Sequence, residues 1–325
     1  MATSKSYERK VSEVFGYLSE ASSAEALRVR REHECPFLAT RCPKLSQHRD
    51  YDSNIPFGAC SVWHRGKGVT EPYPYIICPV RFVQNQSIFL DASRLFSPRE
   101  NSEILVVPEI GLPIGRIDYI IAQCDSATRK VKDFIVLEVM ACSTTTTGDV
   151  LRSFHDILQG RATKRKLKYG INFRQVISRM MVQVLAKAYA CEKWNKCMVW
   201  AIQDVLYRYM QATTKVELES IPPEALESRA SQKSILFFVY GMDMNEEQEM
   251  FELKLTEVYG GNKEDFARIF EPVKIPELEG LLELIQQKVQ DKASVFSLYT
   301  PLSEGLAKVA SKIVRESPTE YGSIR

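Results

Sequence analysis

Three acidic residues occupy places where the sequence otherwise reads as β-strand. Asp118 lies in the run GRIDYII, Glu138 lies in FIVLEVM, and Glu109 lies just upstream in PEIGL. A carboxylate among aliphatic neighbours is costly to bury unless it is paired or binds a cation. Carboxylate oxygens are the ligands that Mg²⁺ prefers, so the pattern favours a hard-cation site. A purely structural pairing of the acids with Arg116 or Lys132 is the alternative.

The elements that must position these acids are predicted to be the two strands of a β-hairpin. Two apolar runs, Arg116–Cys124 and Phe134–Met140, flank a polar turn, which is typical of paired strands. A further strand at Ile104–Val107 leads into the hairpin. A divalent cation held there would neutralise phosphate charge, lower the pKa of a bound water and orient a leaving oxygen, which are the requirements of phosphodiester hydrolysis.

Four of the eight cysteines fall within 44 residues, with six, seventeen and seventeen residues between them. Their segment is rich in Gly, Pro and polar residues, so a structural metal would explain how it stays folded. Four thiolates suit a tetrahedral centre, but the spacing alone fits four unrelated thiols equally well. The cysteines are Cys35, Cys42, Cys60 and Cys78, and His33, His48 and His64 are alternative ligands.

Cations are concentrated after a predicted helix at Gly148–Gly160, where five fall within eight residues. Such a run can contact phosphate groups, although a solvated loop explains it as well. In the predicted helix Phe173–Trp194, Arg179, Gln183 and Lys187 recur every four residues and therefore share one face. That face points either to solvent or to the acidic hairpin and a phosphate backbone. The five cations are Arg161, Lys164, Arg165, Lys166 and Lys168.

The remaining pattern predicts a mixed α/β fold. Hydrophobic residues make up 45% of the 325 residues and the net charge is +2, so any nucleic-acid surface must be a local patch. No apolar run is long enough to span a membrane and the N-terminus is not signal-like, so we expect a cytoplasmic protein. An amphipathic helix is expected at Ser4–Leu18. Later elements are expected as strands at Met198–Ile202, Ile235–Tyr240 and Glu252–Val258 and helices at Lys263–Phe270 and Pro276–Gln290.

The acidic strands resemble the PD-(D/E)xK nuclease signature, through GRID ending at Asp118 and VLEV around Glu138. The wider chain is similar to the NotI family of restriction endonucleases. The similarity is sparse in identity and consistent in order, from about Phe15 to about Pro272. It is carried by CPF at Cys35, by the next cysteine, and by the segments GACSV, ICPVR, PEIGL, GRIDY, FIVLEVM, GINFRQVISRMMVQVLAKAYA and ILFFVYGMD.

This resemblance implies a bacterial, cytoplasmic, homodimeric Type II site-specific deoxyribonuclease. Such an enzyme hydrolyses phosphodiester bonds in double-stranded DNA with Mg²⁺, at a palindromic and GC-rich site. The implied fold is a restriction-endonuclease-like mixed β-sheet flanked by helices, with an N-terminal four-cysteine module that holds structural iron, or zinc. Glu109, Asp118 and Glu138 would then bind Mg²⁺. The implied domains are a helical segment 1–34, the cysteine module 35–86 and a catalytic, DNA-binding domain 87–325.

The chain departs from the family pattern at Met140. The family has Lys or Gln two residues after the Glu, where it polarises the phosphate or the attacking water. Lys187 and Gln183 are the expected substitutes, because their helix follows the hairpin, and Lys132 is a weaker one. Two alternatives stay open, a catalytically weakened DNA-binding protein on a nuclease fold and a structure-specific DNA nuclease. Retention of three acids argues against the first.

Overall fold

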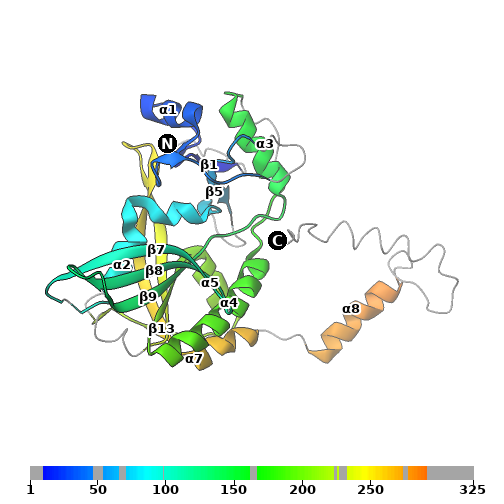
Figure 1. Cartoon of the computed structure of the whole chain (residues 1–325). Helices are drawn as coiled ribbons and strands as arrows, with labels where there is room; N and C mark the ends of the chain where they lie inside the picture. The colour runs from blue at the N-terminus through cyan, green and yellow to red at the C-terminus, as the bar shows by residue number, and fades with distance from the viewer. Residues whose placement is uncertain are drawn as a thin grey trace. The chain divides into compact units, whose positions relative to one another are not determined.

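The computed structural model describes residues 10–46, 54–65, 71–97, 99–161, 167–222, 225–226, 233–273 and 277–290. The chain divides into two compact units, Met1–Glu271 and Pro272–Arg325, and each is described by itself. In the second unit the structure describes one helix, α8 (Leu278–Gln290), close to the expected bounds. None of its described side chains is buried. All other elements below belong to the first unit (Figure 1).

The centre of the first unit is a seven-stranded mixed sheet of order β11-β13-β12-β10-β9-β8-β7. Strands β9, β10 and β12 run parallel, and the outer pairings are antiparallel. β10 is buried along its whole length, as expected for a parallel strand covered on both faces. The strands are β7 (Ser102–Leu112), β8 (Gly115–Asp125), β9 (Val131–Met140), β10 (Met198–Gln203), β11 (Glu219–Ser220), β12 (Ile235–Asn245) and β13 (Met250–Gly261).

Helices cover both faces of this sheet, and alternate strand residues enter two different cores. Val136 and Trp200 pack with residues of α3, α4 and α5, whereas Leu137 and Val199 pack with residues of η1 and α2. The mixed sheet with flanking helices confirms the expected mixed α/β architecture. The helices are η1 (Pro79–Gln86), α2 (Ser87–Ser93), α3 (Thr147–Leu158), α4 (Phe173–Trp194), α5 (Asp204–Thr213), α7 (Lys263–Ala267) and η3 (Arg268–Phe270).

A second, four-stranded sheet of order β2-β1-β5-β6 is formed by the N-terminal part of the chain. The expected helix at Ser4–Leu18 is wrong in its described part, where residues 11–14 and 17–18 are strands. Residues 11–15 are all buried, so this segment has no solvent face for an amphipathic helix to present. Its elements are β1 (Val11–Val14), β2 (Tyr17–Leu18), β5 (Ala59–His64) and β6 (Tyr73–Ile76), beside helix α1 (Ala24–Glu32) and the hairpin β3 (Glu34–Cys35) and β4 (Thr40–Arg41).

A buried ion pair ties this sheet to η1. Glu13 of β1 lies 3.0 Å from Arg81 and accepts a hydrogen bond of 2.6 Å from Ser61 of β5. Burial raises the pKa of Glu13, and the Arg81 guanidinium opposes that rise. Because β1 pairs with β5, segment 1–34 and segment 35–86 share one sheet. Among the described residues, no helix is long and apolar enough to cross a membrane.

Candidate active site

The strand registers place Glu109, Asp118 and Glu138 at matching positions on β7, β8 and β9. The register of β7 with β8 aligns Glu109 with Asp118, and the register of β8 with β9 aligns Asp118 with Glu138. The three acids thus follow one line across neighbouring strands, as the hairpin prediction required. The residue pairs that flank the acids in these ladders are Pro108 with Tyr119, Ile110 with Ile117, and Tyr119 with Leu137.

Asp118 and Glu138 form the inner part of this row. The Asp118 carboxylate accepts a hydrogen bond of 3.0 Å from the backbone N–H of Val139, which holds it against β9. Glu138 is 1% exposed. The pKa of Glu138 is raised to about 7, because burial and, to a smaller extent, the negative charge of Asp118 raise it more than Lys187 lowers it. Glu138 is buried and Asp118 is half-buried; because the Asp118 charge disfavours a charged Glu138, a cation held by both carboxylates would favour the ionised form of each.

Lys187 reaches this pair from α4. Its ammonium lies 2.6 Å from Oε1 of Glu138 and donates a hydrogen bond of 2.6 Å to the carbonyl of Arg116. Lys187 is buried, whereas Gln183, one turn earlier on the same helix, is exposed. Met140 is half-buried and packs against the core on the α4 side. The positive charge that Met140 does not supply is therefore present beside Glu138, on a different element.

Glu109 occupies the outer end of the row, on the edge strand. Its side chain is 71% exposed and lies 3.4 Å from the guanidinium of Arg116. Its backbone has φ of 49°, a left-handed conformation that is uncommon outside glycine and is often found at functional sites. Glu109 is opposite Asp118 in the strand register, but its side chain pairs with exposed Arg116 at the surface.

Trp200 lies on the other side of Glu138. The two residues are Cα partners in the parallel pairing of β9 and β10, so their side chains are on the same face of the sheet. Trp200 is fully buried, and its indole Nε1 has no hydrogen-bond acceptor within the described part of the chain. A large apolar ring at this position contributes to the dry surroundings of Glu138.

The four cysteines of the N-terminal segment are all buried and line one cavity. The cavity has a volume of about 10 Å³, which is room for one small occupant. Backbone N–H groups of Phe37 and Leu38 donate to Cys35, and that of Lys44 donates to Cys42. Burial raises the pKa of both thiols, that of Cys42 to about 11, and these hydrogen bonds oppose the rise.

Neither candidate metal site has ligand geometry as it stands. Across the described residues, no group of three or more His, Cys, Asp or Glu side chains is arranged to hold an ion, so the four-cysteine module is unconfirmed. The donor set nevertheless fits one thiophilic ion, because four buried thiols line one cavity and N–H groups stabilise sulfur charge. Of the alternative ligands, His33 stacks on Phe15 and His64 packs against Tyr75. His48 is outside the described residues.

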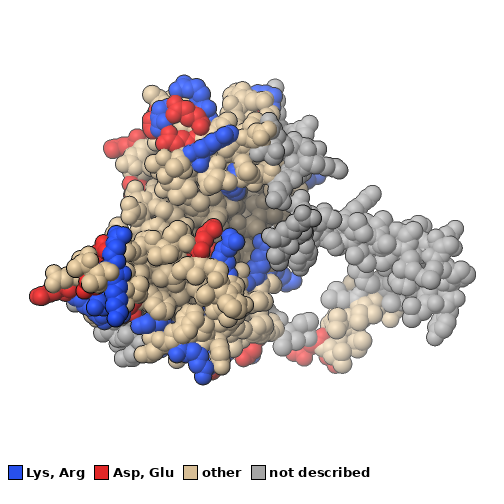
Figure 2. Space-filling model, viewed as in Figure 1, with Lys and Arg blue, Asp and Glu red and all other residues tan. Residues whose placement is uncertain are grey.

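The basic run after α3 is only partly described. Arg161 and Lys168 are exposed, and Arg161 lies 3.0 Å from Asp156. In the view of Figure 2, Lys and Arg side chains and Asp and Glu side chains are scattered in small groups over a surface made mostly of other residues, in keeping with the small net charge. The other members, Lys164, Arg165 and Lys166, lie outside the described residues.

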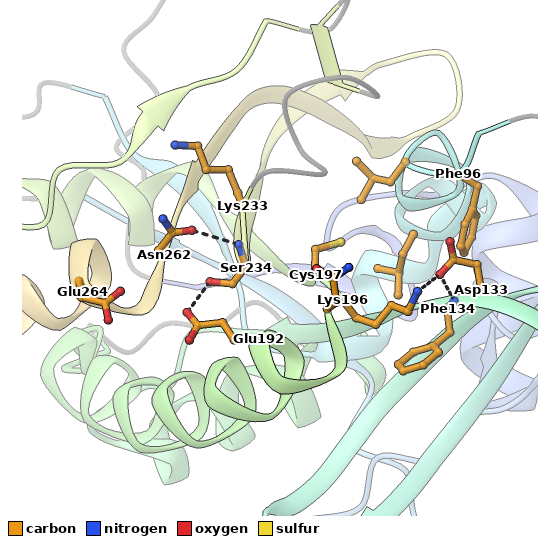
Figure 3. Close-up of a pocket in the computed structure, with 13 residues that line it drawn as sticks. Phe96, Asp133, Phe134, Glu192, Lys196, Cys197, Lys233, Ser234, Asn262 and Glu264 are labelled. Atoms are coloured by element: carbon orange, nitrogen blue, oxygen red, sulfur yellow. Dashed lines mark hydrogen bonds and ion pairs between the residues drawn. The ribbon is translucent and has the colours of Figure 1, made fainter.

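A larger cavity, of about 560 Å³, lies at the opposite end of β9 from the acids (Figure 3). Its charged side chains are paired: Lys196 lies 2.7 Å from Asp133, and Lys233 lies 2.8 Å from Glu219. Glu192 accepts hydrogen bonds from Ser234 and Lys263. Because these charged side chains are already paired with other side chains, they are less suited to bind a ligand or to react than the Asp118–Glu138 pair is.

Comparison with known proteins agrees with the geometry. Residues 25–253 match the family model described as restriction endonuclease NotI. This range is more than half of the 325 residues and contains the three acids, Lys187 and the four cysteines. No curated protein and no solved structure matches the chain. A family of restriction endonucleases implies a DNA-binding nuclease. The chain belongs to the NotI restriction endonuclease family.

Proposed function

We propose that the protein is a sequence-specific Type II restriction endonuclease that hydrolyses double-stranded DNA with Mg²⁺ at a PD-(D/E)xK-like site. The observation that carries this proposal is the 2.6 Å contact between Lys187 and Glu138, opposite Asp118. Two carboxylates and one ammonium are the groups such a site uses. Their convergence from β8, β9 and α4 supports activity despite Met140.

Each group then has a role that its surroundings support. Asp118 and Glu138 would hold Mg²⁺, with Glu109 as an outer ligand. When bound, Mg²⁺ neutralises phosphate charge, lowers the pKa of a coordinated water and orients the leaving oxygen. Lys187 would donate to a non-bridging phosphate oxygen, because its ammonium is already fixed beside the acids. Gln183, exposed one turn away, is suited to a contact with the DNA backbone.

The same proposal extends to the cysteine segment. Cys35, Cys42, Cys60 and Cys78 would hold a structural iron, or zinc, as the family resemblance implies. Such an ion would join the separate parts of the segment that carry the four cysteines. Elemental analysis with an absorption spectrum tests this part, because a ferric tetrathiolate absorbs visible light and zinc does not. Native protein with neither metal would remove the module from the proposal.

The assembly and substrate follow from the resemblance as well. We propose a homodimer that embraces a palindromic, GC-rich duplex, with one active site for each strand. The cations after α3 would contact the DNA backbone. Sedimentation with and without duplex DNA tests the stoichiometry, and a monomer on DNA would contradict it. These cations are Arg161, Lys164, Arg165, Lys166 and Lys168.

Plasmid cleavage tests the activity itself. Incubation with Mg²⁺ is expected to give discrete fragments, and EDTA is expected to abolish them. A smear would indicate a structure-specific or nonspecific nuclease, and a gel shift without cutting would indicate a weakened DNA-binding protein. Asp118→Ala and Glu138→Ala should each abolish cleavage. Asp133→Ala is the matched control, because Asp133 lies on the same strand as Glu138, at the opposite end, where it pairs with Lys196.

A further inference from the structure

Lys44 lines the same cavity as the four cysteines. Its ammonium donates hydrogen bonds to the carbonyl of Ala59 at 3.0 Å and to that of Ile77 at 3.2 Å. Those two residues immediately precede Cys60 and Cys78. One side chain therefore connects the backbone segments that present two of the four thiols.

The same residue also acts on a third thiol. The backbone N–H of Lys44 donates a hydrogen bond to the sulfur of Cys42. The ammonium lies 4.6 Å from the centre of the Phe57 ring, which also lines the cavity and gives the charge an apolar, electron-rich neighbour. Lys44 is thus half-buried and held in place by three contacts.

A fixed positive charge next to a four-thiolate centre would offset part of the negative charge of that centre. Four thiolates carry four negative charges, and a divalent or trivalent ion leaves a net charge of −2 or −1. In a cavity closed to water, that residual charge is stabilised by a nearby cation. Groups that lie just outside the ligands commonly control metal affinity and redox potential in this way.

We propose that Lys44 is the positioning residue of the four-cysteine centre, joining the backbone before Cys60 and Cys78 and offsetting the negative charge of the loaded site. This inference rests on the four-cysteine part of the proposed function. It predicts that Lys44 sets how tightly the ion is held and, where the ion is iron, its midpoint potential. The reduced site is the more negative one, so the ammonium raises that potential.

Three variants separate charge from packing. Lys44→Met keeps the aliphatic stem on Phe57 but removes the charge and both hydrogen bonds. Lys44→Arg keeps a cation, and Lys44→Gln keeps an amide donor without charge. Lys254→Met is the control lysine, because Lys254 lies on β13 and pairs with Asp243 and Glu252 at the surface.

The experiment loads the full-length protein with Zn²⁺ or Co²⁺ and titrates it against a chromophoric chelator. We expect Lys44→Met to weaken metal retention by about 10–100-fold, the usual effect of losing a group that supports metal ligands. Lys44→Arg should retain most of the affinity and Lys254→Met all of it. In iron-loaded protein, potentiometric titration should give a lower midpoint potential for Lys44→Met than for the unaltered protein.

Two different failures can be told apart. If the unaltered, folded protein holds no Zn²⁺, Co²⁺ or iron, the four-cysteine site itself is wrong. If it holds metal and Lys44→Met binds equally tightly at the same potential, the site stands and the role of Lys44 is overturned. Should Lys44→Met not fold, Lys44→Gln decides, because unaltered affinity and potential in that variant would overturn the role of the charge.

Discussion

The buried contact between Lys187 and Glu138 predicts a pH-dependent cost of removing the lysine. Burial holds the pKa of Glu138 at about 7, against 4.5 for an ordinary glutamate. A raised carboxyl pKa means that the folded state binds the proton more tightly than the unfolded chain does. Stability is therefore greatest below pH 4.5 for this group and falls as the pH rises toward 7, by about 3 kcal/mol in total.

Lys187→Met removes an influence that lowers the pKa of Glu138, so its folded-state pKa will exceed 7. The variant then continues to lose stability above pH 7, at about 1.4 kcal/mol per pH unit until its new pKa is reached. At pH 6, Glu138 is mostly protonated in both proteins, and the difference between them reports only lost packing and the lost hydrogen bond to Arg116. The gap should therefore widen by about 1 kcal/mol or more between pH 6 and pH 8.5.

Urea denaturation followed by circular dichroism measures this gap, at constant ionic strength and without divalent cations. The double variant Lys187→Met, Glu138→Gln is the control, because its glutamine does not titrate. The stability difference between the double variant and Glu138→Gln alone should not change with pH. The coupling between Lys187 and Glu138 is refuted if the difference in unfolding free energy between the unaltered protein and Lys187→Met stays constant or narrows from pH 6 to pH 8.5. In plasmid cleavage, the same variant should lose about 10²–10³-fold in rate, the usual effect of deleting one group that stabilises developing charge.

Three further outcomes are expected. Asp118→Asn should abolish plasmid cleavage while gel shifts show retained DNA binding; equal activity would contradict the catalytic assignment. Met140→Lys should alter the cleavage rate, because a second ammonium would enter the site beside Lys187, and an unchanged rate would argue that this position does not face the scissile phosphate. Arg81→Met should destabilise the protein by about 3–5 kcal/mol in urea denaturation, since it leaves Glu13 buried without a counter-charge. Adding Glu13→Gln should restore part of that loss, and a fully additive double variant would disprove the pairing.

The acidic hairpin could be predicted because the residues that define its two strands and its turn follow one another in the sequence. Runs of β-branched residues on either side of a polar turn define β8 and β9, and the single acid in each run identifies the pair Asp118 and Glu138. Lys187 was expected, together with Gln183, as a substitute for the missing cation because their helix follows the hairpin. Its proximity to Glu138 is confirmed by the structure, while its catalytic role stays a prediction.

Other features depend on tertiary context that local pattern does not contain. Val11, Val14 and Phe15 have helical spacing, but Val11 and Val14 lie in β1, which pairs with β5, and Phe15 is buried in the turn that follows β1. β7 extends beyond the expected Ile104–Val107 to include Glu109. Pro108, which cannot donate a hydrogen bond to a strand ladder, is the signal in this sequence that fits its place at the edge of the sheet. Lys44 was not predicted either, although its place two residues after Cys42 is the signal that could have identified it.

The position of Trp200 beside Glu138 gives the protein an internal optical reporter. The chain has three tryptophans: Trp63 lies on β5 and packs edge-on against Phe251, and Trp194, at the end of α4, packs edge-on against Phe134. Trp200 alone is the strand partner of an acid in the candidate active site. In a variant that retains only this indole, its emission would follow changes in charge at Glu138, so cation binding could be observed without DNA and without turnover.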